Sequence, residues 1–117
     1  MASKRQSLKK LKSLAYEEQS GCCIYCDKPM WLHDPKSFAR RFNLTPKQAQ
    51  QLQCTGEHLV RYSAGGKPTP KNIAAAHRYC NCMRHKGGKD ATPDMFRDEV
   101  QRRLGRGKWF PFPVALR

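Results

Sequence analysis

The sequence predicts a small α+β domain in which a short pair of strands packs against helices around a bound metal ion. Three observations lead to this fold class. The chain has 117 residues, which suits one domain with a thin hydrophobic core. A Cys-x-x-Cys pair near the start is answered by a distant His-x-x-Cys pair, the spacing of a zinc site. Segments 55–60 and 72–76 have strand-like composition, while the sequence on either side is helical in pattern. We therefore expect residues 1–117 to form a single domain.

The first expected element is a basic amphipathic helix at residues 4–18. Its apolar residues share one helical stripe and lysines occupy the rest of its surface, so the stripe should dock on the core. The residues of the stripe are Leu8, Leu11, Leu14 and Ala15. Gly21 is expected to end this helix before a short turn unit, CCIYC.

One or two short helices are expected in the segment 34–53. Asp34-Pro35 should open the first, and Thr45-Pro46 has the residue types of a cap and first helical position for the second. The strand TGEHLV follows at 55–60. The next stretch, 61–71, has a glycine pair and two prolines, which indicate a loop.

The last third of the chain is expected to return from strand to helix. The segment NIAAA at 72–76 is extended, and a helix begins with HRYCNCMRHK at 77–86. Thr92-Pro93-Asp94 caps a further helix that runs over 93–104 and stops at Gly105. The remaining tail has two prolines and three aromatic rings, so we expect it to wrap on the body as a coil.

The charge of the chain limits its partners. Lys and Arg number 23 against 9 Asp and Glu, which gives a net charge of +14 and a pI near 9.9. Such a charge favours a polyanion, either nucleic acid or an anionic membrane. No apolar run approaches the roughly 20 residues that cross a bilayer, and the lysine-rich start lacks the apolar segment of a signal peptide. We therefore expect a cytoplasmic protein with a nucleic-acid partner and no membrane.

The six cysteines are expected to bind metal, because thiols in a reducing compartment seldom form disulfides. Cys23-x-x-Cys26 and His77-x-x-Cys80 together make a Cys3His zinc set. Cys82 could replace Cys80 and Cys22 could replace Cys23, while Cys54 is surplus. Spacing favours Cys23 and Cys26 within the first pair.

The order of several spaced elements resembles the HNH endonucleases, of the ββα-metal type. These elements are Glu57-His58, Gly65-Gly66, Asn72-Ile73 and His77-x-x-Cys80-Asn81. The resemblance covers roughly residues 22–88, which would form the core. It implies a two-stranded ribbon packed on one helix, with the acid-histidine pair ending the first strand. The sequence departs from the family in having Glu57 where Asp is commoner, and in a long segment, 30–53, that reads as an insertion.

The acid-histidine pair suits phosphodiester hydrolysis. The His58 imidazole can take a proton from water as a general base. Glu57 projects to the opposite side of the strand and can hold a divalent cation. Asn81 can add a second oxygen ligand, and oxygen ligands favour Mg²⁺ or Mn²⁺. Cys80 is preferred over Cys82 as the zinc ligand because it directly precedes Asn81, so that zinc fixes the helix presenting that ligand.

Further site residues follow from the resemblance or from position. The resemblance implies that Asn72 ties the loop to the second strand and orients His58. His85 lies four residues after Asn81 on the same helical face, where it either contacts the scissile phosphate or completes the metal site. Cations around this centre are expected to contact phosphates. They are Arg61, Arg78, Arg84 and Lys86, with Lys67, Lys71 and Lys89 flanking them.

These observations together predict a metal-dependent DNA endonuclease. One alternative is a non-catalytic, zinc-stapled nucleic-acid-binding module on the same fold. Another is a zinc-ribbon protein that binds RNA or ribosomes, which explains the charge and the cysteines but leaves Glu57-His58 unexplained. Standalone members of the HNH family occur in phages, in other mobile elements and in restriction systems.

Overall fold

A two-stranded antiparallel ribbon lies at the centre of the computed structural model, which describes residues 7–86 and 91–114. The expected α+β class is confirmed. Within the described residues, no helix is long and apolar enough to cross a membrane. The elements in chain order are α1 (Leu8–Glu18), α2 (Pro35–Phe42), α3 (Pro46–Gln51), β1 (Cys54–His58), the 3-10 turn η1 (Tyr62–Ala64), β2 (Ile73–His77), α4 (Arg78–His85) and α5 (Pro93–Gly105).

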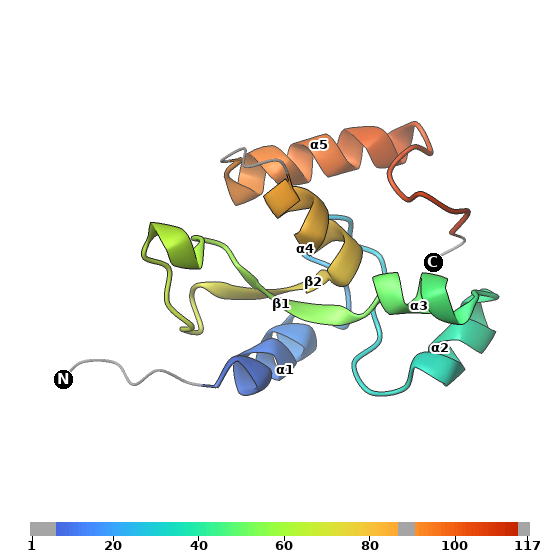
Figure 1. The fold of residues 1–117 in the computed structure, drawn as a ribbon, viewed down its shortest axis with the longest axis horizontal. Helices are drawn as coiled ribbons and strands as arrows, with labels where there is room; N and C mark the ends of the chain where they lie inside the picture. Colours follow the sequence, from blue (N-terminus) through green and yellow to red (C-terminus); the bar gives the residue numbers. More distant parts are fainter. Residues whose placement is uncertain (1–6, 87–90, 115–117) are drawn as a thin grey trace.

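The ribbon is covered by a helix on each side (Figure 1). Cys54 of β1 lies opposite His77 of β2, and His58 lies opposite Ile73. Every residue of β2 is buried, and its three alanines let α1 and α4 approach its two faces. On the edge of β1 away from β2, one isolated bridge joins Trp31 to Gln53. The rest of that edge lies next to the candidate site.

Helices α2, α3 and α5 begin where the sequence predicted. The side chain of Asp34 accepts a hydrogen bond from the Ser37 N–H, and that of Thr92 accepts one from the Met95 N–H. Thr45 exchanges side-chain and backbone hydrogen bonds with Gln48, which is the reciprocal capping box. A proline follows each of these three caps at the first helical position, where its missing N–H costs nothing.

The predicted apolar stripe of α1 is half wrong. Leu11 and Ala15 are buried, whereas Leu8 and Leu14 are 42% and 45% exposed. The ribbon under α1 has only two strands, so the helix buries a narrow line of residues four apart. The helix also ends at Glu18, before Gly21. The helix begins at Leu8, with Ser7 as its N-cap, and not at residue 4 as expected. Residues 1–6 lie outside the described residues.

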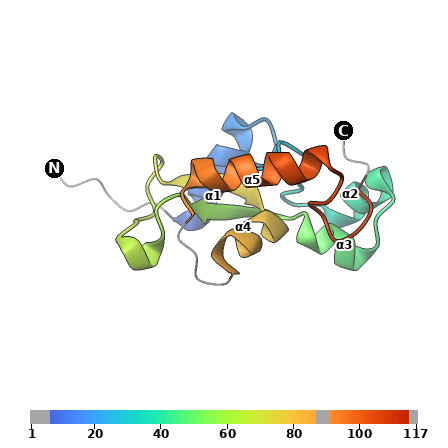
Figure 2. The ribbon, with the colours of Figure 1, turned by 90° about the horizontal axis from the view of Figure 1, so that it is seen from above.

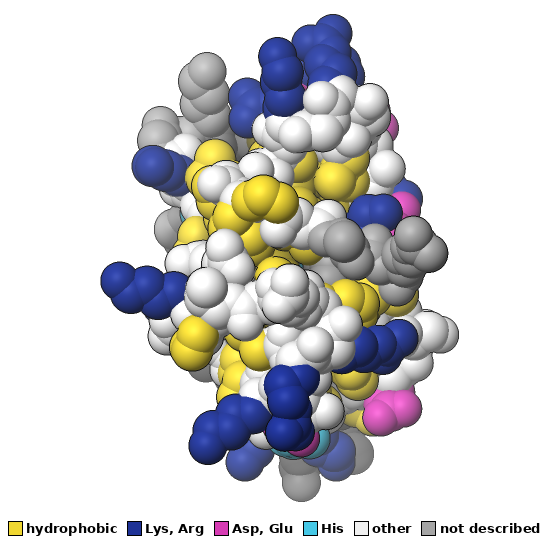
Figure 3. Space-filling model, turned by 90° about the vertical axis from the view of Figure 1, so that its right-hand side faces the viewer, with side chains coloured by type: hydrophobic (Ala, Val, Ile, Leu, Met, Phe, Trp, Pro, Cys, Tyr) yellow, Lys and Arg dark blue, Asp and Glu magenta, His cyan; other side chains and the backbone are white. Residues whose placement is uncertain are grey.

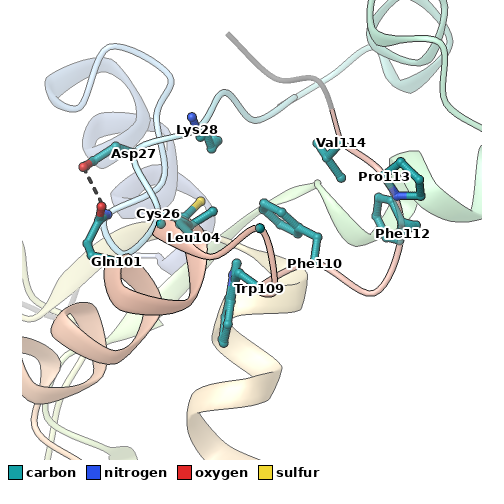
Figure 4. Close-up of a pocket in the computed structure, with 12 residues that line it drawn as sticks. Cys26, Asp27, Lys28, Gln101, Leu104, Trp109, Phe110, Phe112, Pro113 and Val114 are labelled. Carbon is teal, nitrogen blue, oxygen red and sulfur yellow. Dashed lines mark hydrogen bonds between the residues drawn. The ribbon is translucent and has the colours of Figure 1, made fainter.

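The C-terminal tail joins two hydrophobic clusters. The larger cluster contains four cysteines with Phe96, Val100 and Trp109, and the smaller one is built on Phe38 and Leu52. Figure 2 shows the tail after α5 turning back toward α2 and α3. Tail residues 109–114 meet the turn at 26–28 and the end of α5 around a cavity of about 560 Å³ (Figure 4). The expected coil therefore packs on the body.

Candidate functional site

Four buried side chains meet in a cluster that could hold a zinc ion. Their ligand atoms all lie within 4.8 Å of one another. Cys23 and Cys26 come from the turn after α1, His77 ends β2, and Cys80 lies in the first turn of α4. This is the predicted Cys3His set. The three remaining cysteines, Cys22, Cys54 and Cys82, lie outside the cluster, so the geometry favours the four predicted ligands over these alternatives.

The imidazole of His77 is oriented by a backbone carbonyl. Its Nε2 lies 2.7 Å from the Pro29 oxygen, and its Nδ1 lies 3.1 Å from the Cys26 sulfur. A hydrogen bond donated by Nε2 leaves Nδ1 as the atom with a free electron pair. A carbonyl behind the ring is the usual support for a histidine that ligates a metal.

The pKa values of the thiols in the cluster are shifted in opposite directions. Burial alone would raise the pKa of Cys23, but hydrogen bonds with Cys26, Cys80 and His77 outweigh it and hold that pKa well below its usual value. Burial and hydrogen bonding to Cys23 raise the pKa of Cys80. The Trp109 ring N–H lies 3.3 Å from the Cys80 sulfur and donates to it. One thiolate is thus already favoured, and a zinc ion would displace the protons that the other thiols keep.

A separate, open cleft of about 350 Å³ lies at the end of β1. None of its lining residues comes from β2, so the cleft opens on the edge of β1 that faces away from the second strand. It brings together residues from β1, from the segment around η1 and from α4. They are Gly56, Glu57, His58, Arg61, Tyr62, Ser63, Asn81 and His85.

The carboxylate of Glu57 is 0% exposed as a residue and has partners on both oxygens. The Tyr25 hydroxyl donates to Oε2 at 3.0 Å, and an Arg84 nitrogen lies 3.4 Å from the same oxygen. The His85 Nε2 lies 2.9 Å from Oε1. Burial raises the pKa of Tyr25 and the charge of Glu57 raises it further, so the phenol keeps the proton that it donates.

The structure places Arg84 in the interior, although a phosphate contact at the surface was expected from the sequence. The residue is 4% exposed. Its guanidinium donates to the carbonyl oxygens of His58 at 3.0 Å, Leu59 at 2.9 Å and Ala91 at 3.1 Å. This face of α4 turns toward the end of β1, where the buried charge of Glu57 needs a cation. Arg84 therefore fixes the strand end that carries the acid-histidine pair.

Alternation along β1 separates the acid from the histidine, as expected. Thr55 and Glu57 both meet α4, the former through a 3.1 Å hydrogen bond from the Asn81 amide nitrogen. His58 therefore leaves the strand on the other side, and its ring lies edge-on to that of Tyr62 with centroids 6.4 Å apart. Since Asn81 uses its nitrogen on Thr55, its side-chain oxygen can serve a group in the cleft.

Asn72 lies outside the cleft and closes the base of the loop that follows β1. Its side-chain oxygen accepts from the Val60 N–H at 2.7 Å, and its nitrogen donates to the carbonyls of Val60 and Lys67, each at 3.1 Å. The glycine pair in this loop fits a tight path. Gly65 has a left-handed φ of 91°, and a Cβ on Gly66 would clash with the Val60 carbonyl oxygen.

The remaining expected phosphate contacts lie at different places. Arg61 lines the cleft. Arg78 and Lys86 are exposed at the start and just beyond the end of α4, and they do not line the cleft. Lys67 and Lys71 are exposed on the loop between the strands, and Lys89 lies outside the described residues.

The donor set in the cleft fits a divalent cation. It offers the Oε1 atom of Glu57, the side-chain oxygen of Asn81 and the Nε2 atom of His85. Neighbouring ligands of an octahedral ion, each bound at about 2.1 Å, lie about 3 Å apart. The 2.9 Å between Glu57 and His85 is compatible with that spacing and with a direct hydrogen bond.

The role of Tyr25 and the interior position of Arg84 were not predicted from the sequence. Tyr25 lies between the two zinc cysteines of the first pair, a turn held close to the ribbon by the Ile24 N–H, which donates to the Ala75 oxygen. A tyrosine at that place is the one signal that could have indicated a partner for a buried carboxylate.

Comparison with known families gives one match. A model of the HNH endonuclease family matches residues 23–87, which is more than half of the chain. The matched range includes all four residues of the zinc cluster and every residue that lines the cleft. Neither the curated proteins nor the solved structures contain a match to the chain.

Proposed function

The chain belongs to the HNH endonuclease family, and we propose that it is a metal-dependent endonuclease that hydrolyses DNA phosphodiester bonds. The observation that carries this proposal is the cleft at the end of β1. It gathers an imidazole, a carboxylate and an amide at a surface open to a large substrate, and a second imidazole lies beside the carboxylate. Family membership alone supports a role with nucleic acid, and the cleft supports hydrolysis.

His58 is proposed to act as the general base that takes a proton from the attacking water. It leaves β1 on the side opposite to Glu57, whose charge is already balanced by Arg84. The imidazole is therefore not tied up in an ion pair with its neighbour. Asn72 is proposed to position His58 indirectly. Its side chain bonds the backbone of Val60, two residues after His58, and so fixes the start of the loop that follows β1.

Glu57, Asn81 and His85 are proposed to hold Mg²⁺ or Mn²⁺. When bound, this cation would polarise the phosphate and stabilise the leaving oxygen. Tyr25 and Arg84 both bond Oε2 of Glu57, which aims Oε1 toward His85. The zinc cluster is proposed to fix the start of α4, where Asn81 directly follows Cys80.

The basic surface is proposed to bind the DNA backbone. Arg61 lines the cleft and is proposed to contact the phosphate nearest the reaction, and Arg78 and Lys86 are exposed at either end of α4. The net charge of +14 implies that several phosphates are neutralised on binding. Affinity should then fall steeply with salt, because counterion release drives the association.

One observation favours a second candidate, a non-catalytic nucleic-acid-binding module. Both oxygens of Glu57 already have protein partners, as expected for a carboxylate that only supports the fold. In that case Glu57 would not release His85 for a cation, and the cleft would bind phosphate without hydrolysing it.

A plasmid-cleavage assay decides between the two candidates. The zinc-loaded protein is incubated with supercoiled plasmid in Mg²⁺, in Mn²⁺ and in buffer freed of divalent cations. We expect nicked or linear product only with the added cation. His58→Ala should lower the rate by about 100-fold or more, while zinc content and DNA affinity remain those of the original protein.

Two controls exclude loss of zinc and contaminating nuclease as explanations of the result. Elemental analysis after each incubation verifies that zinc has stayed bound, so that lost cleavage is not lost fold. The His58→Ala protein, purified in the same way, controls for contaminating nuclease. DNA binding without cleavage under any cation would reject the endonuclease and leave the binding module.

A further inference from the structure

A groove between α2 and α3 lies outside the cleft and beside the start of β1. Its volume is about 570 Å³, and its walls come from the segment 30–53, which reads as an insertion in the sequence. Figure 3 looks at the end of the molecule that carries these two helices, where patches of hydrophobic surface lie between lysine and arginine side chains. Its lining includes Trp31, Lys36, Ala39, Pro46, Lys47 and Gln50.

The groove combines an aromatic ring with positive charge. From residue 35 to residue 56 the chain has four cations, Lys36, Arg40, Arg41 and Lys47, and no acidic residue. Lys36 and Lys47 are exposed and line the groove itself. Trp31 is half-buried, with its ring nitrogen fixed to the Ala49 carbonyl at 2.6 Å, so its ring is held in place without a ligand.

The groove and the cleft lie along the same edge of β1. Trp31 is bridged to Gln53 on the edge away from β2, and the cleft opens on that edge at Glu57. Four residues of extended chain from Gln53 to Glu57 span about 13 Å. Phosphates along one DNA strand are about 3.4 Å apart along the helix axis, so a strand in the cleft reaches the groove within a few nucleotides.

We propose that this groove binds an unpaired base of the nucleic-acid strand that is cut in the cleft, together with its flanking phosphates. The proposal rests on the proposed function only in identifying that strand as the substrate. A base stacked on an aromatic ring is sequence-tolerant and stabilises binding by about 1–3 kcal/mol. The two lysines match the phosphates on either side of the base, and the Gln50 amide can pair with a base edge.

An unpaired base fits the groove better than a paired one does. In a duplex the base faces are covered by their neighbours, so a rigid double helix has no flat apolar surface to insert between Trp31 and the two helices. A strand that is frayed, flapped or gapped near the cut site has such a surface. The structure thus points to substrates with single-stranded character beside the scissile phosphate.

The first test measures affinity in the His58→Ala background, which is chosen to bind without cutting. Fluorescence anisotropy compares a labelled, fully paired duplex with the same duplex bearing a single-stranded arm. Lys36→Glu/Lys47→Glu should weaken binding to the armed duplex by about tenfold more than binding to the plain duplex. The control, Arg106→Glu/Lys108→Glu, makes the same change of charge at two exposed residues after α5. It should weaken both DNAs equally.

The second test blocks the groove without changing charge. Ala39→Phe places a ring in the groove, so the preference for the armed duplex should disappear while zinc content and melting temperature stay the same. Trp31 emission reports occupancy directly, because Trp109, the second tryptophan of the chain, is only 3% exposed. Unpaired DNA should quench emission in the His58→Ala protein and fail to do so after Ala39→Phe.

The outcomes separate this inference from the proposed function. The groove would be rejected as a base-binding site if Lys36→Glu/Lys47→Glu weakened binding to the armed and the plain duplex equally, as the control variant does. It would also be rejected if unpaired DNA left Trp31 emission unquenched and Ala39→Phe kept the original preference for the armed duplex. A groove that binds protein instead would give this same result with DNA. Cleavage plays no part in either test, so a protein that never cuts plasmid can still pass both, and an active nuclease can fail both.

Discussion

The zinc cluster and the Glu57 centre are two buried polar clusters that satisfy their charges by different means. In the first, three thiols and an imidazole converge so that one ion can satisfy all of them. In the second, a single carboxylate is surrounded by donors from the turn after α1 and from α4. Tyr25 touches both clusters, since its N–H donates to the Cys23 sulfur and its hydroxyl to Glu57.

This difference assigns distinct tasks to the two clusters. The zinc cluster joins three parts of the chain, and an ion bound there would supply much of the folding free energy that a small domain with a thin core needs. The Glu57 centre aims a carboxylate toward an open cleft and contributes less to stability. Variants should therefore lose fold and activity together in the first cluster, and activity before fold in the second.

The largest effect is expected from Cys26→Ala. A structural zinc site contributes about 10–16 kcal/mol in small zinc domains, which matches or exceeds the whole stability of about 5–15 kcal/mol of a typical domain. The variant should lose zinc and most of its helical circular dichroism. Cys82→Ala removes a thiol that is exposed and outside the cluster, so it should keep both. If Cys26→Ala remained folded and bound zinc, the four-residue cluster would not be the zinc site.

Glu57→Gln should have a large effect on cleavage and a small one on folding. The amide can still accept from Tyr25 and Arg84, so the free energy of unfolding should fall by no more than about 3 kcal/mol. A hard cation is held largely by charge, so cleavage at low Mg²⁺ should fall about 100-fold. Glu57→Ala is a poorer test, because it removes the acceptor oxygens as well as the charge, so that both the Tyr25 hydroxyl and the buried Arg84 lose a hydrogen-bond partner.

Cleavage rate against Mg²⁺ and Mn²⁺ concentration measures this effect. The midpoint for Glu57→Gln should move to higher metal, and excess Mn²⁺ should restore part of the rate. His58→Ala serves as the contrast, because loss of a base is not repaired by more metal. A Glu57→Gln protein with the original metal dependence would show that the carboxylate orients the site and is not a ligand.

The sequence predicted the zinc cluster better than it predicted the Glu57 centre, and the reason is physical. Two residues separate Cys23 from Cys26, and two separate His77 from Cys80, so each half of the site is a local pair whose spacing can be read in the sequence, and the two pairs together indicate a metal site. The helix starts at Asp34, Thr45 and Thr92 were equally predictable, since a cap and the proline after it act within one turn.

Long-range contacts set the limits of that prediction. Tyr25 is 32 residues from Glu57 in the chain and Arg84 is 27 residues away, so no spacing relates them before the ribbon and α4 are in place. In the sequence, an arginine that contacts phosphate at the surface looks the same as one that pairs with a buried carboxylate. Only the turn of α4 toward the end of β1 assigns Arg84 to the interior.

The smallest effect is expected from Tyr25→Phe. This variant tests most directly whether the zinc cluster and the Glu57 centre are linked, because Tyr25 touches both. The change removes the 3.0 Å hydrogen bond to Oε2 of Glu57 and leaves the zinc cluster intact. Arg84 still contacts that oxygen, so the carboxylate should be aimed less well but remain charged. We expect a loss of about 1 kcal/mol in stability, unchanged zinc content, and a fall in cleavage rate of less than tenfold.

Tyr79→Phe is the matched control for this last variant, because it removes a hydroxyl that donates to the Trp109 carbonyl at the same distance, 3.0 Å, away from the cleft. Both variants should lower the melting temperature by about 4 °C or somewhat more, and Tyr25→Phe alone should slow cleavage. Single-turnover rates at saturating Mg²⁺ make the comparison independent of metal affinity. If the two variants slowed cleavage equally, the Tyr25 hydroxyl would only support the fold, and Arg84 alone would aim Glu57. If only Tyr25→Phe were slower, the turn that carries Cys23 and Cys26 would also position the Glu57 carboxylate for cleavage, and the two clusters would be coupled through a single side chain.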